Sequence, residues 1–262
     1  MAHTPDGGDS QQVSPAGAED ADLQAGIGDL AGLVAGSMAL PELLAEVATF
    51  AARTIPGADG VGVALLQTDR TKIVVTGSAS SAPIVDQIDR LQYETLHEGP
   101  SFTVAADRRT VRSGSLGGEK RWPRFGPRVG RLGIHSVLAL PLMVSDRVIG
   151  AISVYGHGKH VFDDNAVELG ELFAKPAAVA VHNAHILAQA IALTVQLQTA
   201  LATRPVIDQA IGLIRGRTGR SADESFAQLK AISQADHRKV SEVAQQVVDE
   251  AVRRARARLT GA

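Results

Sequence analysis

The sequence predicts an α+β protein in three parts: an antiparallel sheet sandwiched with helices, a long connecting coiled-coil helix, and a C-terminal bundle of three helices. Four short β-branched runs, bounded by Gly, Asp and Ser, predict the strands, and all of them lie before residue 156. A seven-residue apolar repeat then predicts the long helix. Apolar stripes at helical spacing end the chain and predict the bundle.

Composition limits the function. The 262 residues are 45% hydrophobic, which is enough for two domains with a core each. No cysteine occurs, so disulfides, thiolate metal sites and cysteine nucleophiles are excluded. The net charge of −2 is uneven, because residues 189–262 contain eleven basic and seven acidic residues whereas the remainder is acidic. This imbalance favours an anionic partner for the C-terminal part.

The N-terminal region has little to bury. Residues 1–22 are rich in Gly, Ser, Asp and Gln and contain no Lys or Arg, which is typical of a disordered tail. They lack a basic flank and an apolar core, and no apolar run reaches the roughly eighteen residues of a membrane span. We therefore expect a cytoplasmic protein with no membrane partner. Apolar residues between positions 23 and 55 predict two helices, the second starting at Pro41.

Four segments have the residue pattern of strands, and the last two are joined by a tight turn at Ser145 and Asp146. The segments are residues 61–67, 72–78, 136–144 and 147–155. Because their apolarity is nearly continuous, we expect a helical layer on each face of the sheet.

Helical excursions separate the two pairs of strands. Residues 83–92 predict a helix, and Gly99 with Pro100 predicts a break after which the chain is extended. A second short helix is expected from Trp122 to Gly133.

The region of residues 23–188 resembles a GAF domain. The matching stretches are YETLHEGPSFTVAADRRTVRS, WPRFGPRVGRLGIHSVLALPLMVSDRVIGAISVYG and HVFDDNAVELGELFAKPAAVAVHNA. The resemblance implies a sensing or dimerising module with a small pocket, which we expect to be flanked by Tyr93, Phe102 and Trp122. GAF domains that hold bilins do so through cysteine, and Ser101 stands where related sequences often carry Cys. We expect no cofactor; an unknown small-molecule ligand and a purely structural GAF domain both stay open.

Two pairs of histidines have a spacing that zinc could use: His157 with His160, and His182 with His185. A zinc site needs a third and a fourth ligand, and no acid or histidine is placed to supply them. We therefore predict exposed histidines and no metal site.

A long helix is predicted to begin at Asp163 or Asp164 and to continue, with an irregularity at Pro176, to about Thr203. Apolar residues recur along it every seven positions, and a second set that includes a polar Asn occupies the complementary positions. The two sets are Leu172, Val179, Ile186 and Leu193, and Asn183 and Leu197. This repeat predicts the seam of a parallel homodimer, with residues 189–203 as the connector. The alternative is a helix that packs only on its own domain.

Three amphipathic helices are predicted after the connector. Apolar residues from Ile207 to Ile214 form the first stripe, Gly219 ends that helix, and Ser221 with Glu224 forms a capping box for the next. The remaining stripes are Phe226, Leu229 and Ile232, which we expect in the core, and a third helix that starts at Asp236 with Val240, Val243, Ala244, Val247, Val248 and Ala251.

The run RPVIDQAIGLIRGRTGRSADESFAQLKAISQADHRKVSEVAQQVV resembles an ANTAR domain, a module of bacterial transcription antitermination regulators, and we assign it residues 204–258. The resemblance implies binding to hairpin RNA in nascent transcripts. One departure is Arg215, which stands where the family usually has Met. The residues expected to bind RNA are Ala210, Gly212, Arg215, Arg217, Arg220, Arg238 and Lys239. We expect the charged ones to form one surface at an end of the bundle, and the arginines after residue 252 to be solvated.

The sequence therefore predicts a signal-responsive, RNA-binding antitermination regulator. The alternative is a DNA-binding or protein-interaction regulator whose GAF domain is purely structural. Catalysis is not expected, because the acids and histidines are scattered rather than paired at a spacing that converges.

Overall fold

The computed structural model describes residues 24–26, 28, 38–69 and 72–260. The predicted tail and most of the first predicted helix lie outside these residues. The chain divides into two compact units, with the boundary between Ala188 and Gln189.

The first unit is built on a five-stranded antiparallel sheet with the strand order β2-β1-β5-β4-β3. Its strands are β1 (Gly60–Asp69), β2 (Lys72–Ser80), β3 (Val111–Ser113), β4 (Ser136–Val144) and β5 (Arg147–Gly156). Four of them were predicted, and the short β3 was not. Ser145 and Asp146 both have positive φ, at 46° and 62°, which is the geometry of a two-residue hairpin turn.

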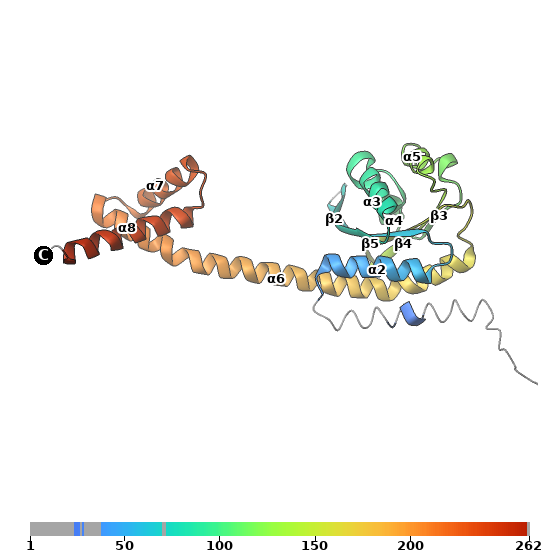
Figure 1. Cartoon of the computed structure of the whole chain (residues 1–262), viewed down its shortest axis with the longest axis horizontal. Helices are drawn as coiled ribbons and strands as arrows, with labels where there is room; N and C mark the ends of the chain where they lie inside the picture. The colour runs from blue at the N-terminus through green and yellow to red at the C-terminus, as the bar shows by residue number, and fades with distance from the viewer. Residues whose placement is uncertain (1–23, 27, 29–37, 70–71, 261–262) are drawn as a thin grey trace, which may run out of the picture. The chain divides into compact units, whose positions relative to one another are not determined.

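Helices cover both faces of this sheet, as predicted (Figure 1). On one face lie α2 (Leu40–Thr54) and the first part of α6 (Asp164–Thr218), where Leu44, Val47 and Phe173 are fully buried against the strands. Pro41 occupies the first turn of α2, as expected from the sequence. The second face is covered by the helical excursions.

The first of these excursions differs from the prediction. The first comprises α3 (Pro83–Asp89) and a π-helical segment η1 (Arg90–Leu96), and α4 (Pro100–Asp107) follows directly. The predicted extended segment after Gly99 is therefore wrong. Pro100 occupies the first turn of a helix, where its fixed φ is favourable and its missing N–H costs nothing.

The second excursion contains η2 (Leu116–Gly118) and α5 (Phe125–Arg131). Helix α5 is shorter than predicted, since Trp122 precedes it. The Glu98 carboxylate accepts hydrogen bonds from the backbone N–H groups of Arg124 (2.7 Å) and Phe125 (2.9 Å), and so caps its N-terminus.

Helix α6 is a single helix from Asp164 to Thr218. The Asp163 carboxylate accepts a hydrogen bond from the Ala166 N–H (2.8 Å), which confirms an aspartate cap at its start. Neither Pro176 nor Thr203 ends it, so the predicted connector and the first helix of the bundle are one element. An eighteen-residue stretch of α6 is long and apolar enough to cross a membrane, and 17% of that stretch is buried, which corrects the expectation that no such run exists.

The second unit is a bundle formed by the end of α6 with α7 (Ala222–Ala235) and α8 (Val240–Thr260). The capping box is confirmed: the Ser221 hydroxyl accepts from the Glu224 N–H (3.2 Å), and the Glu224 carboxylate accepts from the Ser221 N–H (2.8 Å). Gly219 ends α6 at φ 72°. The third helix starts at Val240 and not at Asp236, because Asp236 closes α7 and His237 adopts a left-handed φ of 53°.

Candidate sensor pocket and nucleic-acid surface

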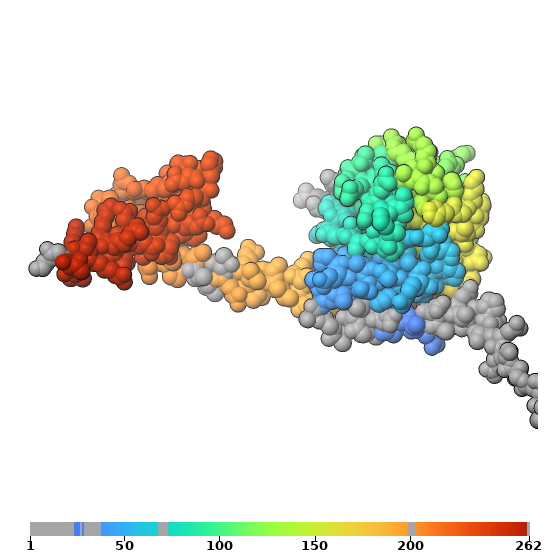
Figure 2. Space-filling view, in the orientation of Figure 1, coloured from blue at the N-terminus to red at the C-terminus, as the bar shows by residue number. Residues whose placement is uncertain are grey.

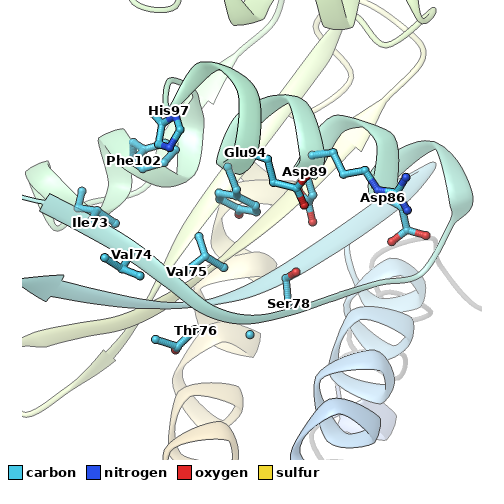
Figure 3. A pocket seen from close by; sticks show the side chains of 13 residues that line it. Ile73, Val74, Val75, Thr76, Ser78, Asp86, Asp89, Glu94, His97 and Phe102 are labelled. Carbon is cyan, nitrogen blue, oxygen red and sulfur yellow. The ribbon is translucent and has the colours of Figure 1, made fainter. Parts of the chain in front are cut away.

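A hollow of about 510 Å³ lies between the edge strand β2 and the run of α3 and η1 (Figure 3). Strand β2 forms its floor, and Asp86, Asp89 and Glu94 come from the helical run above it. The full lining is Ile73, Val74, Val75, Thr76, Gly77, Ser78, Asp86, Asp89, Arg90, Tyr93, Glu94, His97 and Phe102. The π-helical geometry of η1 is rare, and such segments often occur at functional sites.

Asp89 is the most unusual group in this hollow. Its side chain is 6% exposed, and its Oδ1 has no hydrogen-bond partner among the described residues. Burial, and secondarily the charge of Asp86, raises the pKa of Asp89 from 3.8 to about 8. A carboxyl group at this position is therefore largely protonated at neutral pH.

Ser101 connects the helical layer to the sheet next to this hollow. Its hydroxyl lies 2.9 Å from the Tyr93 hydroxyl, 2.9 Å from the Ser153 hydroxyl and 3.2 Å from Gln92 Nε2, which donates to it. Its backbone N–H donates to Gln92 Oε1 (3.1 Å). A hydroxyl has one donor and two acceptor positions, so three partners saturate it. Ser101 is thus a buried structural hub rather than a free nucleophile.

Two of the three predicted pocket residues line the hollow, namely Tyr93 and Phe102, whose rings are 6.0 Å apart. Trp122 does not line it. Its ring is 2% exposed, and its Nε1–H donates to the Thr103 hydroxyl (2.8 Å). Asp89 was not identified from the sequence, because a single Asp in a helical pattern gives no sign of burial. The available signal was its position four residues after the apolar Val85, which places both residues on the same buried face of the helix.

Among residues 24–26, 28, 38–69 and 72–260, no group of three His, Asp or Glu side chains is placed to hold a metal ion. The His157 ring lies 3.1 Å from the carbonyl oxygen of Gly133. The pair His182 and His185 lies on α6, and both side chains are half-buried rather than exposed.

The predicted dimer seam is an exposed apolar stripe on α6. Its apolar members are between 40% and 56% exposed, and Asn183 is exposed as well. They are Leu172 (40%), Val179 (53%), Ile186 (50%), Leu193 (56%) and Leu197 (55%). Ala177, Ala178 and Val181 on the same helix are buried against the sheet. The seam therefore lies on a part of α6 that its own unit does not cover.

The two small residues of the predicted RNA site have different surroundings. Ala210 is fully buried in the bundle core with Ile214, Leu229 and Ala244, so its size serves helix packing and it cannot contact RNA. Gly212 is exposed, and a Cβ at this position would meet no atom within 4 Å. Only Gly212 leaves the backbone open to a ligand.

The basic residues of the predicted site form two groups at opposite ends of the bundle. Arg215, Arg217 and Arg220 lie where α6 ends, whereas Arg238 and Lys239 follow α7. Helix α7 has 14 residues and therefore spans about 21 Å between the two groups. Figure 1 shows it running from the end of α6 to the opposite end of the bundle. The expectation of a single surface for all five residues is wrong, because it overlooked that α7 runs back along the bundle.

These five side chains also differ in their contacts. Arg215, Arg217 and Lys239 are exposed and make no side-chain hydrogen bond or ion pair within the described part of the chain. The Arg220 guanidinium donates to Gln228 Oε1 (2.6 Å). Arg238 donates to Gln246 Oε1 (2.7 Å) and lies 3.8 Å from the Glu242 carboxylate. The unpaired cations are the ones most available to an anion.

Phe226 does not lie in the core as predicted; its side chain is 42% exposed. Helix α7 buries Ser225 and Leu229 instead, and Ile232 is also 36% exposed. The residue pattern did not identify the buried face of α7 correctly. A polar Ser is buried and the apolar Phe next to it is exposed, which is the reverse of what their polarity predicts. Phe226 lies in the second turn of α7, near the end that carries Arg220.

Both units correspond to known domains. The GAF domain model matches residues 37–182, which is more than half of the chain, and the ANTAR domain model matches residues 195–248. The chain thus belongs to the GAF-domain family and carries an ANTAR domain after it. It is a regulator by architecture, with an ANTAR RNA-binding output domain.

Solved structures similar to this chain include GAF domains of two phosphoenolpyruvate-protein phosphotransferases. That from Acinetobacter is 17% identical with a TM-score of 0.48, covering 64% of this chain and 95% of its own. That from Coxiella burnetii is 16% identical with a TM-score of 0.47, covering 67% and 98%. A free methionine-R-sulfoxide reductase from Neisseria meningitidis is 18% identical with a TM-score of 0.45, covering 63% and 91%. No curated protein sequence matches the chain.

Proposed function

We propose that this protein is a homodimeric transcription antitermination regulator that binds hairpin RNA through its C-terminal bundle under the control of its GAF unit. The observation that carries the proposal is the end of the bundle where α6 meets α7. Unpaired Arg215 and Arg217, the open backbone at Gly212 and the exposed Phe226 lie in this part of the ANTAR match. Cations for phosphates together with an aromatic face for an unstacked base are what recognition of an RNA loop requires.

Helix α6 supplies the route for control in this proposal. It packs on the sheet of the first unit through Phe173 and Ala177, and it supplies Ala210 and Ile214 to the core of the bundle. The exposed stripe of α6 from Leu172 to Leu197 pairs with a second copy. A change in how the two α6 helices pair then alters how the two bundles are presented to RNA.

The signal enters, in this proposal, through the hollow between β2 and η1. A buried carboxyl group without a partner is costly unless a ligand or a proton compensates it, and Asp89 is such a group. A small molecule that donates a hydrogen bond to Asp89 would stabilise the conformation of η1 to which it binds. Without such a ligand, the GAF unit acts only as a dimerising scaffold.

The protein functions in the cytoplasm under this proposal, because nascent RNA is its target. The apolar stretch of α6 is better explained as a dimer seam than as a membrane span, since it carries His182, Asn183 and His185. Three polar side chains within about one helical turn are costly in hydrocarbon and tolerated in a coiled coil. We propose no catalytic activity, because the chain lacks cysteine and Ser101 is held in a saturated network.

The deciding experiment is crosslinking of the protein to RNA in its own cells, followed by sequencing. Hairpins from the recovered transcripts are then tested for binding against duplex DNA of the same sequence. We expect enrichment of hairpins that overlap terminators and a clear preference for RNA. Equal or tighter binding to the duplex DNA would favour the DNA-binding alternative and overturn the proposal.

A further inference from the structure

Helix α8 continues well beyond the ANTAR match, which ends at residue 248. It has 21 residues, seven more than α7, so its last part extends about 10 Å past the helix on which it packs. This extension contains Arg253, Arg254, Arg256 and Arg258, and no acid occurs after Glu250. All four arginines are exposed.

The side of α8 that packs into the bundle becomes basic in this extension. Val240, Ala244 and Val247 belong to the bundle core or pack on it, and Ala251 is half-buried. Continuing the same alternation of four and three residues gives Arg254 and then Arg258. Apolar residues stop where α6 and α7 no longer cover the helix, and arginines replace them on the same side.

The chain path brings this extension to the end of the bundle that holds Arg215, Arg217 and Arg220. Helix α7 starts at that end and leads to the opposite end of the bundle, and α8 runs back in the reverse direction. Arg254 lies fourteen positions after Val240, and α7 is fourteen residues long. Arg254 is therefore about level with the start of α7. Figure 1 shows the C-terminal half of α8 at the end where α6 stops, and Figure 2 shows its dark red atoms open on the surface. These arginines are exposed, as the sequence predicts, but their position at the basic end of the bundle was not predicted.

The helix dipole explains only part of the arginine content of the extension. Cations are favourable in the last turn of a helix, but the effect fades beyond it, and only Arg258 lies in the last turn. Arg254 pairs with Glu250 on the same helix, whereas Arg253, Arg256 and Arg258 have no side-chain partner within the described part of the chain. Besides Glu250, the start of α7 contributes the acids Asp223 and Glu224 to this end, and Glu224 is engaged in the cap of α7.

We propose that the extension of α8 binds the phosphate backbone of the RNA that the bundle recognises. Arg253 to Arg258 form one basic surface with Arg215, Arg217 and Arg220, which reaches past the family-matched domain. This inference rests on the proposed function, since it names further contacts to the same RNA. Guanidinium groups suit this role because they bind phosphate oxygens through paired N–H groups.

The test compares two double variants of the full-length protein that remove the same charge. Arg254→Gln with Arg258→Gln changes the extension, and Arg204→Gln with Lys230→Gln removes the same charge from exposed positions of α6 and α7 outside the predicted RNA site. Glutamine preserves helix propensity, and circular dichroism checks that helix content is unchanged. The probe is a fluorescent synthetic RNA hairpin whose dissociation constant is measured by anisotropy across a range of salt concentrations.

We expect the extension variant to bind the hairpin about 10-fold more weakly and to lower the slope of log affinity against log salt by one to two, roughly 0.7–0.9 per lost contact. The matched variant should change both values much less. Arg254→Lys with Arg258→Lys should restore most of the affinity, because lysine still neutralises phosphate.

Three outcomes would overturn the inference. If the extension variant binds like the wild type while the wild type binds RNA, only this inference fails. If the wild-type protein binds no hairpin RNA, the proposed function fails with it. If the wild type binds phosphatidylglycerol vesicles through these arginines and RNA binding is unaffected by their loss, the extension is a lipid-binding element instead.

Discussion

The hydroxyl of Ser101 on α4 lies 2.9 Å from the hydroxyl of Ser153 on β5, and this contact joins the helical layer of the sensor unit to the centre of its sheet. Both side chains are buried, with exposures of 0% and 1%. Gln92 and Tyr93 complete the network from η1, the segment that lines the hollow. Ser101 therefore links η1 to the sheet by hydrogen bonds, in addition to the apolar packing of Leu96.

Replacing Ser101 with Ala should destabilise the sensor unit by about 2–4 kcal/mol, because it leaves the Gln92 amide and the Tyr93 hydroxyl without their shared partner in a buried site. Urea unfolding followed by the fluorescence of Trp122, the only tryptophan, measures this change. Ser78→Ala on the exposed surface of β2 is the control and should stay within about 0.5 kcal/mol. A Ser101→Ala midpoint equal to that of the wild type would contradict the role of Ser101 as a hub.

Asp89 should make the stability of the sensor unit fall as pH rises. Its pKa is raised to about 8 in the folded chain from 3.8, so the folded state retains a proton that the unfolded state releases. The associated stability is fully present below about pH 4, declines between pH 4 and 8, and is lost above the folded pKa. We expect a decline of about 2–5 kcal/mol across this window that is absent from Asp89→Asn.

Urea unfolding at several pH values tests this prediction as the difference between the wild type and Asp89→Asn. Asp86→Asn is the matched control, because Asp86 lines the same hollow but is exposed and contributes less to the pKa shift of Asp89 than burial does. That variant should keep most of the pH dependence. Parallel stability curves for the wild type and Asp89→Asn would show that Asp89 is not buried as a neutral acid.

The elements with strong local signals were predictable from the sequence. Alternation and turn residues located four strands and the Ser145–Asp146 turn, and the capping box of Ser221 and Glu224 located the start of α7. The helix at Pro100 was not predictable in the same way, because Gly-Pro is compatible both with an extended segment and with the first turn of a helix. Strand β3 has three residues, which is too short for a periodic signal.

The site depends on relationships that a linear pattern does not contain. Arg220 and Arg238 are both near helix ends, but whether they share an end depends on the direction of α7 between them. The burial of Asp89 depends on Gly62, whose missing side chain lets the carboxylate approach; a Cβ there would lie 2.9 Å from Asp89 Oδ2. The exposure of Phe226 likewise follows from Ser225 facing the core.

The dimer seam should be sensitive to charge. In the proposed homodimer, Ile186 and Leu193 are buried against the partner, so replacing both with Glu places four unpaired carboxylates in one seam and should dissociate the dimer at micromolar concentration. Sedimentation equilibrium measures the mass. Ala192→Glu with Gln198→Glu adds the same charge at exposed positions of α6 outside the repeat and should leave the dimer intact. A wild-type protein that is monomeric at these concentrations would contradict the proposed homodimer.

Phe226 should contribute to RNA binding rather than to folding. Its ring is 42% exposed next to the basic end of the bundle, and stacking of one base on an aromatic side chain is worth about 1–3 kcal/mol. Phe226→Ala should therefore weaken binding to the hairpin by about 5- to 100-fold, with a loss of folding stability below about 1 kcal/mol. Anisotropy titrations and urea unfolding measure the two quantities separately.

Two further variants identify the physical cause of such a loss. Phe226→Leu retains an apolar side chain of similar bulk but has no π-face, so it should bind as weakly as Phe226→Ala, whereas Phe226→Trp should bind at least as well as the wild type. Leu229→Ala, three positions later, is the matched core control: Leu229 is fully buried, and its loss should cost about 2–5 kcal/mol of folding stability. If Phe226→Leu binds the hairpin with wild-type affinity, the ring does not stack on a base and Phe226 serves only as an apolar contact.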